Sequence, residues 1–139
     1  MTRVDFYVAS GAGQLARLEV AARLSDKARR RGHRLFIHAS SEDEAVALDE
    51  VLWSFRPTSF VPHSLAADDA SAEVVIGWAT EPSDHNDVLI NLALAPPPFF
   101  SRFQRVAEIV TQENQGLEAL RNSWRFYKDR GYPLQKHDL

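Results

Sequence analysis

The sequence predicts an α/β fold, a three-layer sandwich in which helices cover both faces of a mainly parallel sheet. Segments with strand character alternate with segments of helical periodicity, as in parallel sheets joined by helices. The length of 139 residues suits one hydrophobic core, so we expect a single domain over residues 1–139. An apolar fraction of 45% and a charged fraction of 25% are those of an ordinary globular domain.

The first half of the chain contains two predicted strands and two predicted helices. Residues 3–8 are rich in β-forming residues and precede a glycine turn, and residues 34–38 repeat the strand pattern. Between them, apolar residues at helical spacing predict a helix over residues 14–31. The next helix should begin after Ser41, because an N-cap serine followed three residues later by Glu44 is a capping-box pattern.

The second half is predicted to contain a short extended piece, two buried strands and two helices. The extended piece covers residues 60–63, and the apolar runs over residues 74–78 and 88–92 are the strands. Three prolines then precede a helix predicted over residues 99–110, and a last helix is expected over residues 117–130. The first of these two helices should bury Phe99, Phe103, Val106 and Val110. In this order the elements predict a Rossmann-like sandwich.

Charge is unevenly distributed along the chain. Residues 1–39 carry eight basic against three acidic residues, whereas residues 40–90 carry one basic against eleven acidic residues. Such segregation favours distinct basic and acidic surfaces, which suit protein partners or anions. Because the whole chain is acidic, with a net charge of −3, we do not expect it to bind duplex DNA directly.

The sequence contains no cysteine, which excludes disulfides, cysteine catalysis and the common structural zinc sites. It also contains no apolar run long enough for a membrane span and no visible secretory signal. We therefore expect a soluble cytoplasmic protein with no membrane contact.

One glycine motif has the character of a nucleotide site. The run Gly11-Ala12-Gly13-Gln14-Leu15-Ala16 follows the first predicted strand, where such glycines allow a pyrophosphate to approach a helix N-terminus. The acidic residue expected at the end of the next strand is missing, because that strand ends in His38-Ala39-Ser40. A plain turn is the ordinary interpretation, and a small dinucleotide-binding oxidoreductase or regulator using Gly11-Ala12-Gly13 is the alternative function. No P-loop, nucleophile elbow or zinc-protease motif occurs, so we expect no catalytic residue, metal or cofactor.

The last predicted helix carries two adjacent stripes. The apolar stripe contains Leu117, Leu120, Trp124 and Tyr127, and the basic stripe contains Arg121, Arg125 and Lys128. An amphipathic helix with one buried side explains both stripes. Arginine beside an aromatic ring also suits a ligand that is both anionic and apolar, such as a peptide C-terminus with a large apolar last residue.

A second aromatic group follows the second predicted helix. Trp53, Phe55 and Phe60 lie within eight residues of one another. Aromatic side chains at a helix end either cap the core or form a protein-binding surface, and the residues alone leave both interpretations open.

Four motifs in this chain resemble those of one known family. They are Leu48-Asp49-Glu50-x-Leu52-Trp53, Ser59-Phe60-Val61-Pro62-His63-x-Leu65, Asp87-Val88-Leu89-Ile90-Asn91-Leu92 and Arg121-x-x-Trp124-x-x-Tyr127-x-x-x-Gly131. With these motifs in this order over most of its length, the sequence resembles the chi subunits of the bacterial DNA polymerase III holoenzyme. The resemblance implies a non-enzymatic adaptor in DNA replication.

The resemblance also implies two partners and the residues that bind them. Chi-like proteins pair with the psi subunit of the clamp loader and bind the acidic, phenylalanine-terminated tail of single-stranded DNA-binding protein. By position, Trp53 and Phe60 belong to the psi-binding surface, which some chi-like proteins also offer to a helicase-like partner. The tail-binding residues are Arg121, Trp124, Tyr127 and Arg125. Some relatives carry a lysine where this chain has Leu117, and the residues leave open whether Arg125 supplies that charge or the tail binds less tightly.

Overall fold

The computed structural model describes residues 1–54 and 63–139 of the chain. Within them, seven parallel strands form one sheet in the order β3-β4-β2-β5-β6-β1-β7. The strands are β1 (Arg3–Val8), β2 (Leu35–Ala39), β3 (Ser64–Leu65), β4 (Val74–Trp78), β5 (Val88–Asn91), β6 (Arg105–Val110) and β7 (Leu134–Asp138). The helices are α1 (Gln14–Arg30), α2 (Glu42–Ser54), the short 3₁₀ helix η1 (Phe100–Arg102) and α3 (Asn114–Asp129).

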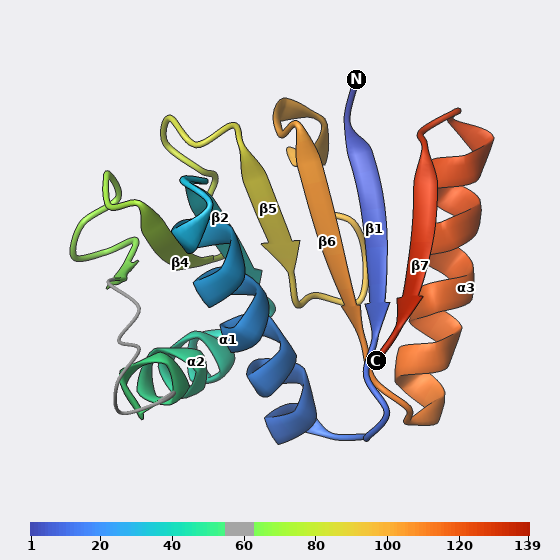
Figure 1. Cartoon of the computed structure of the whole chain (residues 1–139), viewed down its shortest axis with the longest axis horizontal. Helices are drawn as coiled ribbons and strands as arrows, with labels where there is room; N and C mark the ends of the chain where they lie inside the picture. The colour runs from blue at the N-terminus through green and yellow to red at the C-terminus, as the bar shows by residue number, and fades with distance from the viewer. Residues whose placement is uncertain (55–62) are drawn as a thin grey trace.

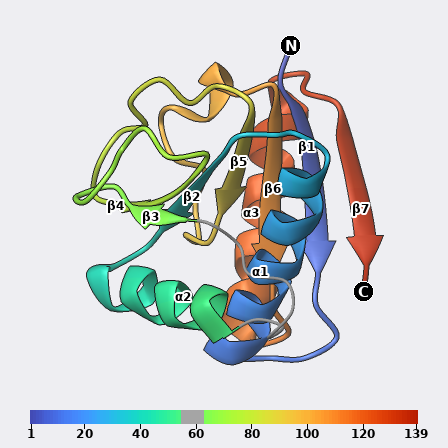
Figure 2. The ribbon, with the colours of Figure 1, turned by 60° about the vertical axis from the view of Figure 1, so that its left-hand side comes forward.

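Helices cover both faces of the sheet, as the sequence predicts. Figure 2 shows α1 in front of the strands and α3 behind them. One apolar core lies between the sheet and the helices α1 and α2, and a second lies between the sheet, η1 and α3. In Figure 1, β4 lies towards one end of the sheet and β7, with α3 beside it, at the other. None of the helices in the described part of the chain is long and apolar enough to cross a membrane.

Most predicted elements are confirmed to within a few residues. The N-cap of α2 is formed by Ser41, whose Oγ accepts the backbone N–H of Glu44 at 3.1 Å. The return contact differs from a capping box, because the Glu44 carboxylate accepts the N–H of Ser40 at 2.8 Å rather than that of Ser41. Of the extended piece predicted over residues 60–63, residues 60–62, Phe60 among them, lie outside the described residues.

The helix predicted over residues 99–110 is wrong. This segment forms η1 and then β6, which pairs with β5 on one side and β1 on the other. The predicted core residues are nevertheless buried: Phe99, Phe103, Val106 and Val110. A spacing of four puts Val106 and Val110 on one face of a strand as well as on one face of a helix, so burial alone could not distinguish them.

Strand β7 was not predicted from the sequence. Its residues, Leu134–Asp138, include a single aliphatic side chain and lack the alternation of a half-buried strand. It forms because β1 would otherwise expose an edge, and the pairing runs from Val4 with Leu134 to Val8 with Asp138. The available neighbour, rather than local propensity, decides this element.

Candidate functional site

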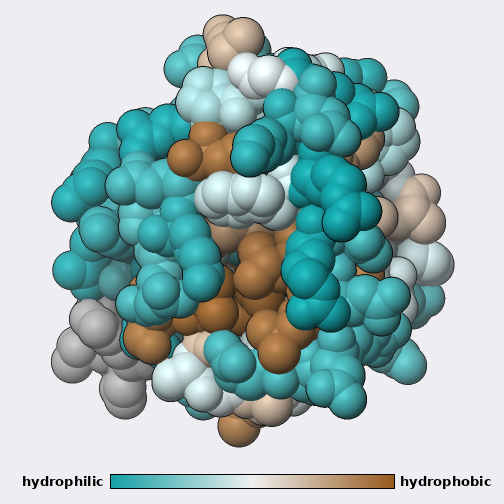
Figure 3. Space-filling model, turned by 90° about the vertical axis from the view of Figure 1, so that its right-hand side faces the viewer, coloured by the Kyte–Doolittle hydropathy of each residue, from teal (hydrophilic) through white to brown (hydrophobic). Residues whose placement is uncertain are grey.

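A shallow groove of about 600 Å³ runs along α3 beside β7. It is lined by Leu120, Arg121, Trp124, Arg125, Lys128, Asp129 and Lys136. The structure therefore brings together Arg121, Trp124 and Arg125, three of the four residues predicted for one site. Figure 3 shows the side of the molecule on which α3 and β7 lie, where apolar surface is gathered between hydrophilic borders.

The ring of Trp124 is half-buried and connects the groove to the core. Its centroid lies 5.2 Å from that of Phe6 in β1, so the indole is held against the sheet while part of it borders the groove. Arg121 and Arg125 are exposed one helical turn apart. Gly116 allows the start of α3 to approach the end of β6, because an added Cβ would collide with the carbonyl oxygen of Thr111. The groove thus combines a fixed aromatic wall with accessible cations.

Tyr127 does not belong to the groove surface, which corrects its predicted place beside the ligand. Its side chain is fully buried, and its hydroxyl donates a hydrogen bond of 2.7 Å to Glu108 Oε2. A residue three positions after Trp124 is rotated by about 60° around the helix, and here that rotation points it into the core. Phe6 and Phe100 surround the ring at 6.0 and 5.2 Å. Tyr127 therefore positions α3 and does not line the groove.

The partner of Tyr127 is a buried carboxyl group that the sequence analysis missed. Glu108 in β6 is 5% exposed and also accepts a hydrogen bond of 2.9 Å from Asn91 Nδ2. Burial raises the pKa of Glu108 to about 7, although both hydrogen bonds lower it. A glutamate within the apolar run Val106–Val110 was the available signal, because such a residue needs buried partners.

Trp53 lies at the end of α2, on the opposite face of the sheet from α3. It is 62% exposed, and its ring meets that of His63 at 5.3 Å. His63 Nε2 lies 2.9 Å from Asp49 Oδ1, so two of the sequence motifs meet in space. Of the two residues predicted for this second surface, Trp53 is described and exposed, and Phe60 lies outside the described residues.

At the glycine motif after β1, the side chain of Glu113 occupies the space that a bound ligand would take. The Gly13 N–H donates to Glu113 Oε2 at 3.0 Å, and Arg17 binds the other oxygen of that carboxylate at 3.1 Å. Hydrogen bonds, first that from the Thr111 hydroxyl, lower the pKa of Glu113 to about 2. A negative carboxylate therefore occupies the place at which a pyrophosphate would bind, and this geometry disfavours the dinucleotide alternative.

Comparison with protein families shows which family this chain belongs to. Residues 1–135 match the family model described as DNA polymerase III chi subunit, HolC. The chain belongs to the DNA polymerase III chi subunit family. The chi subunit of Pseudomonas aeruginosa is 50% identical over 139 residues, covering 100% of this chain and 98% of that protein. The chi subunit of Escherichia coli is 33% identical over 108 residues, covering 76% of this chain and 74% of that protein. As a chi-family chain it is a component of DNA replication.

Solved structures show how widely the chi-family fold is shared. The structure of T4 UvsW covers 99% of this chain with a TM-score of 0.65 at 7% identity, and the match spans 42% of that protein. Domain 2 of the DEAD-box helicase Mss116p, solved with an RNA duplex, covers 97% of this chain with a TM-score of 0.62 at 8% identity, spanning 64% of that protein. At such low identity these matches show a common α/β fold and nothing about activity.

Proposed function

We propose that this chi-family chain is a non-catalytic adaptor that works in the cytoplasm with DNA polymerase III. It binds the psi subunit of the clamp loader through a surface with Trp53 and Phe60, and that surface also suits a helicase-like partner. It binds the C-terminal tail of single-stranded DNA-binding protein in the α3 groove. The observation that carries the proposal is the groove, in which Arg121 and Arg125 lie beside the half-buried ring of Trp124.

The groove suits a peptide that ends in a carboxylate and a large apolar side chain. Arg121 offers paired N–H donors for the terminal carboxylate, and the terminal phenylalanine packs on Trp124. Further along the tail, acidic residues face Arg125, Lys128 and Lys136. These cations are exposed, so added salt should weaken the complex.

The position of Leu117 supports the first of the two possibilities that the sequence leaves open, in which Arg125 supplies the second charge. Leu117 is half-buried and packs against the core beneath α3, outside the residues that line the groove. A lysine at that position is therefore not needed for the groove to be basic, because Arg125 and Lys136 border it. We propose that these two residues supply the second charge.

Titration calorimetry with two peptides tests the tail site. The first peptide ends in Asp-Ile-Pro-Phe, and the second lacks the final phenylalanine. Binding should require the phenylalanine and should weaken as salt is raised. Equal binding of both peptides, or binding of neither, would overturn the proposed tail site.

The position of Trp53 supports a separate psi site. Since α2 and α3 lie on opposite faces of the sheet, Trp53→Ala should abolish capture of purified psi subunit and leave tail-peptide affinity unchanged. Circular dichroism of the variant checks the fold. Loss of both activities in a folded variant would contradict separate sites.

A further inference from the structure

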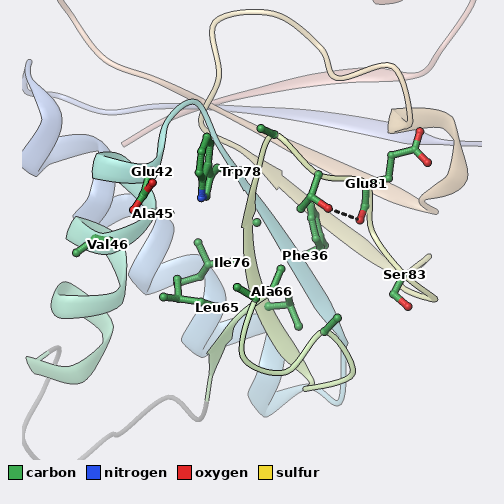
Figure 4. A pocket seen from close by; sticks show the side chains of 16 residues that line it. Phe36, Glu42, Ala45, Val46, Leu65, Ala66, Ile76, Trp78, Glu81 and Ser83 are labelled. Carbon is green, nitrogen blue, oxygen red and sulfur yellow. Dashed lines mark hydrogen bonds between the residues drawn. The ribbon is translucent and has the colours of Figure 1, made fainter.

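A second cavity lies near the end of the sheet that is farthest from α3. Its volume is about 430 Å³, and it opens where β4 meets the first turns of α2 and the loop after β4. Figure 4 shows Leu65, Ala66 and Ile76 gathered on one side, with Trp78 standing between β4 and α2. Trp78 is 43% exposed and Val46 is 42% exposed, so the mouth of the cavity is apolar and accessible.

The strand edge beside this cavity is only partly covered. β3 pairs with just two residues of β4, Val75 and Ile76, and the last contact on that side is Ala66 N–H to Ile76 O at 2.8 Å. The chain then turns away through hydrogen bonds to Leu65 O. Residues two apart in a strand direct their backbone groups to the same side. Trp78 therefore directs its N–H and C=O to the same side as Ile76, beyond the end of β3. Among the described residues, no strand pairs with Trp78 on this side.

The surroundings of the cavity are strongly acidic. The two segments that supply most of its walls, residues 42–46 and 65–84, contain no lysine or arginine. They contain eight acidic residues: Glu42, Asp43, Glu44, Asp68, Asp69, Glu73, Glu81 and Asp84. Three of the eight are paired: Arg102 lies 3.2 Å from Glu81, Arg34 lies 3.5 Å from Asp84 and Arg17 lies 3.8 Å from the buried Glu44. Glu42, by contrast, lies exposed at the cavity itself.

We propose that this cavity is a second peptide-docking site, which takes an extended basic segment of a partner protein. One aliphatic side chain of that segment fills the apolar cavity, its backbone pairs with Trp78, and its lysine or arginine side chains face Glu42 and the neighbouring acids. The site has the opposite charge preference to the α3 groove, so the acidic tail proposed for that groove is repelled here. The proposal does not rest on the tail site.

Nuclear magnetic resonance of the ¹⁵N-labelled full chain tests the proposal with the capped peptide Lys-Arg-Val-Leu-Val-Arg-Lys. We expect saturable shifts of the Trp78 backbone and indole N–H signals and of Val46. Replacing the central leucine by serine, or all four cations by glutamate, should each weaken binding at least about tenfold. No shift at Trp78 up to about 1 mM peptide, or equal binding of the glutamate peptide, would overturn the proposal.

Val46→Lys provides the matching change in the protein. It places a cation at the cavity mouth on an exposed helix position and should weaken the basic peptide at least about fivefold. Leu15→Lys is the control, because Leu15 is also an exposed helical side chain, at 64%, but lies on α1 outside the cavity. Equal affinity of the two variants would contradict the site. Titration of the tail peptide should be unaffected by Val46→Lys, which separates this test from that of the α3 groove.

Sedimentation of the chain alone distinguishes a foreign peptide from a second copy. We expect a monomer, since the proposed occupant belongs to another protein. Self-association that Val46→Lys abolishes would show that a second copy fills the cavity and would overturn the proposal.

Discussion

The hydroxyl of Tyr127 and the carboxyl of Glu108 meet in a buried 2.7 Å hydrogen bond between α3 and β6. Both side chains are buried, and the bond joins the helix that carries the basic groove to β6, an inner strand of the sheet. The same helix is held by Trp124 against Phe6 in the neighbouring strand. The helix that carries the groove is therefore held to the core by a buried hydrogen bond and by an aromatic contact.

Glu108→Gln should change how stability depends on pH. The folded-state pKa of Glu108, about 7, lies above its ordinary value of 4.5, so its contribution is fully present below pH 4.5 and is lost as the pH rises through 7. Glutamine resembles the protonated form, because its amide oxygen can still accept from Asn91 Nδ2 while its NH2 group donates to the Tyr127 hydroxyl oxygen. Denaturant unfolding should show the variant gaining roughly 3 kcal/mol relative to the parent chain between pH 4.5 and pH 8. Parallel stability curves would contradict a buried carboxyl with a raised pKa.

Tyr127→Phe should destabilise the protein without reducing its affinity for the tail peptide. The change removes one donor to a buried carboxyl group and should cost about 1–2 kcal/mol of unfolding free energy. It should also raise the pKa of Glu108 further, because the bond from Tyr127 lowers it. Tyr132→Phe is the control, since no hydrogen bond joins the Tyr132 hydroxyl to the rest of the described chain. A tail-peptide affinity reduced beyond about twofold would indicate that Tyr127 acts at the surface after all.

Arg121→Ala should weaken binding of the tail peptide by about 2 kcal/mol, because the bound carboxylate would lose its paired donor in a partly desolvated contact. The loss should shrink as salt is raised. Arg23→Ala, a change of an exposed arginine on α1, should leave calorimetric affinity unchanged. Unchanged affinity in Arg121→Ala at fixed salt would remove Arg121 from the site.

Gly77→Ala should destabilise the protein at β4, the strand that lines the second cavity. An added Cβ would lie 2.5 Å from Phe36 Cζ and 3.0 Å from Thr80 Cγ2, so the buried ring must shift. We expect a loss of about 1–3 kcal/mol in thermal or denaturant unfolding. Gly11→Ala is the matched control, because its Cβ would meet only Ala16 Cβ, at an ordinary 3.6 Å. Equal stability of the two variants would show that Phe36 adjusts freely.

Glu113→Gln should make the protein less sensitive to acid. The pKa of Glu113 is lowered to about 2, so its contribution is present above pH 4.5 and is lost as the pH falls towards 2. The variant should be less stable than the parent chain at pH 7, and the difference should narrow by pH 3. A constant difference, measured by denaturant unfolding at both values, would show that the charge of Glu113 does not support the turn at Gly13.

The sequence was sufficient for the fold class and for the strands that are short apolar runs bounded by turns. The runs predicted over residues 74–78 and 88–92 form β4 (Val74–Trp78) and β5 (Val88–Asn91), and both strands are buried apart from Trp78. It was insufficient where two periods coincide, as for Val106 and Val110, which share a face in a helix and in a strand. It was also insufficient for β7, whose polar residues become a strand only because β1 offers an open edge.

The same distinction applies to the candidate sites. Helical spacing correctly placed Arg121, Trp124 and Arg125 on one surface, because all three belong to one helix. It could not decide how far round the helix the core extends, and Tyr127 lies on the buried side of that boundary. The cavity beside β4 is lined by residues of α2, β3 and β4, and only the folded chain shows that these segments meet.

The position of β1 has a consequence for synthesis of the chain. β1 leaves the ribosome before the other described strands and pairs with residues 105–110 on one side and 134–138 on the other, so both of its neighbours are made much later. Contacts of such high sequence separation carry a large loop-closure entropy and slow folding. Because β7 also supplies Lys136 to the groove, a chain released before residue 134 is made would lack both β7 and part of the proposed tail site. The whole groove can therefore form only after residues 134–138 have been made.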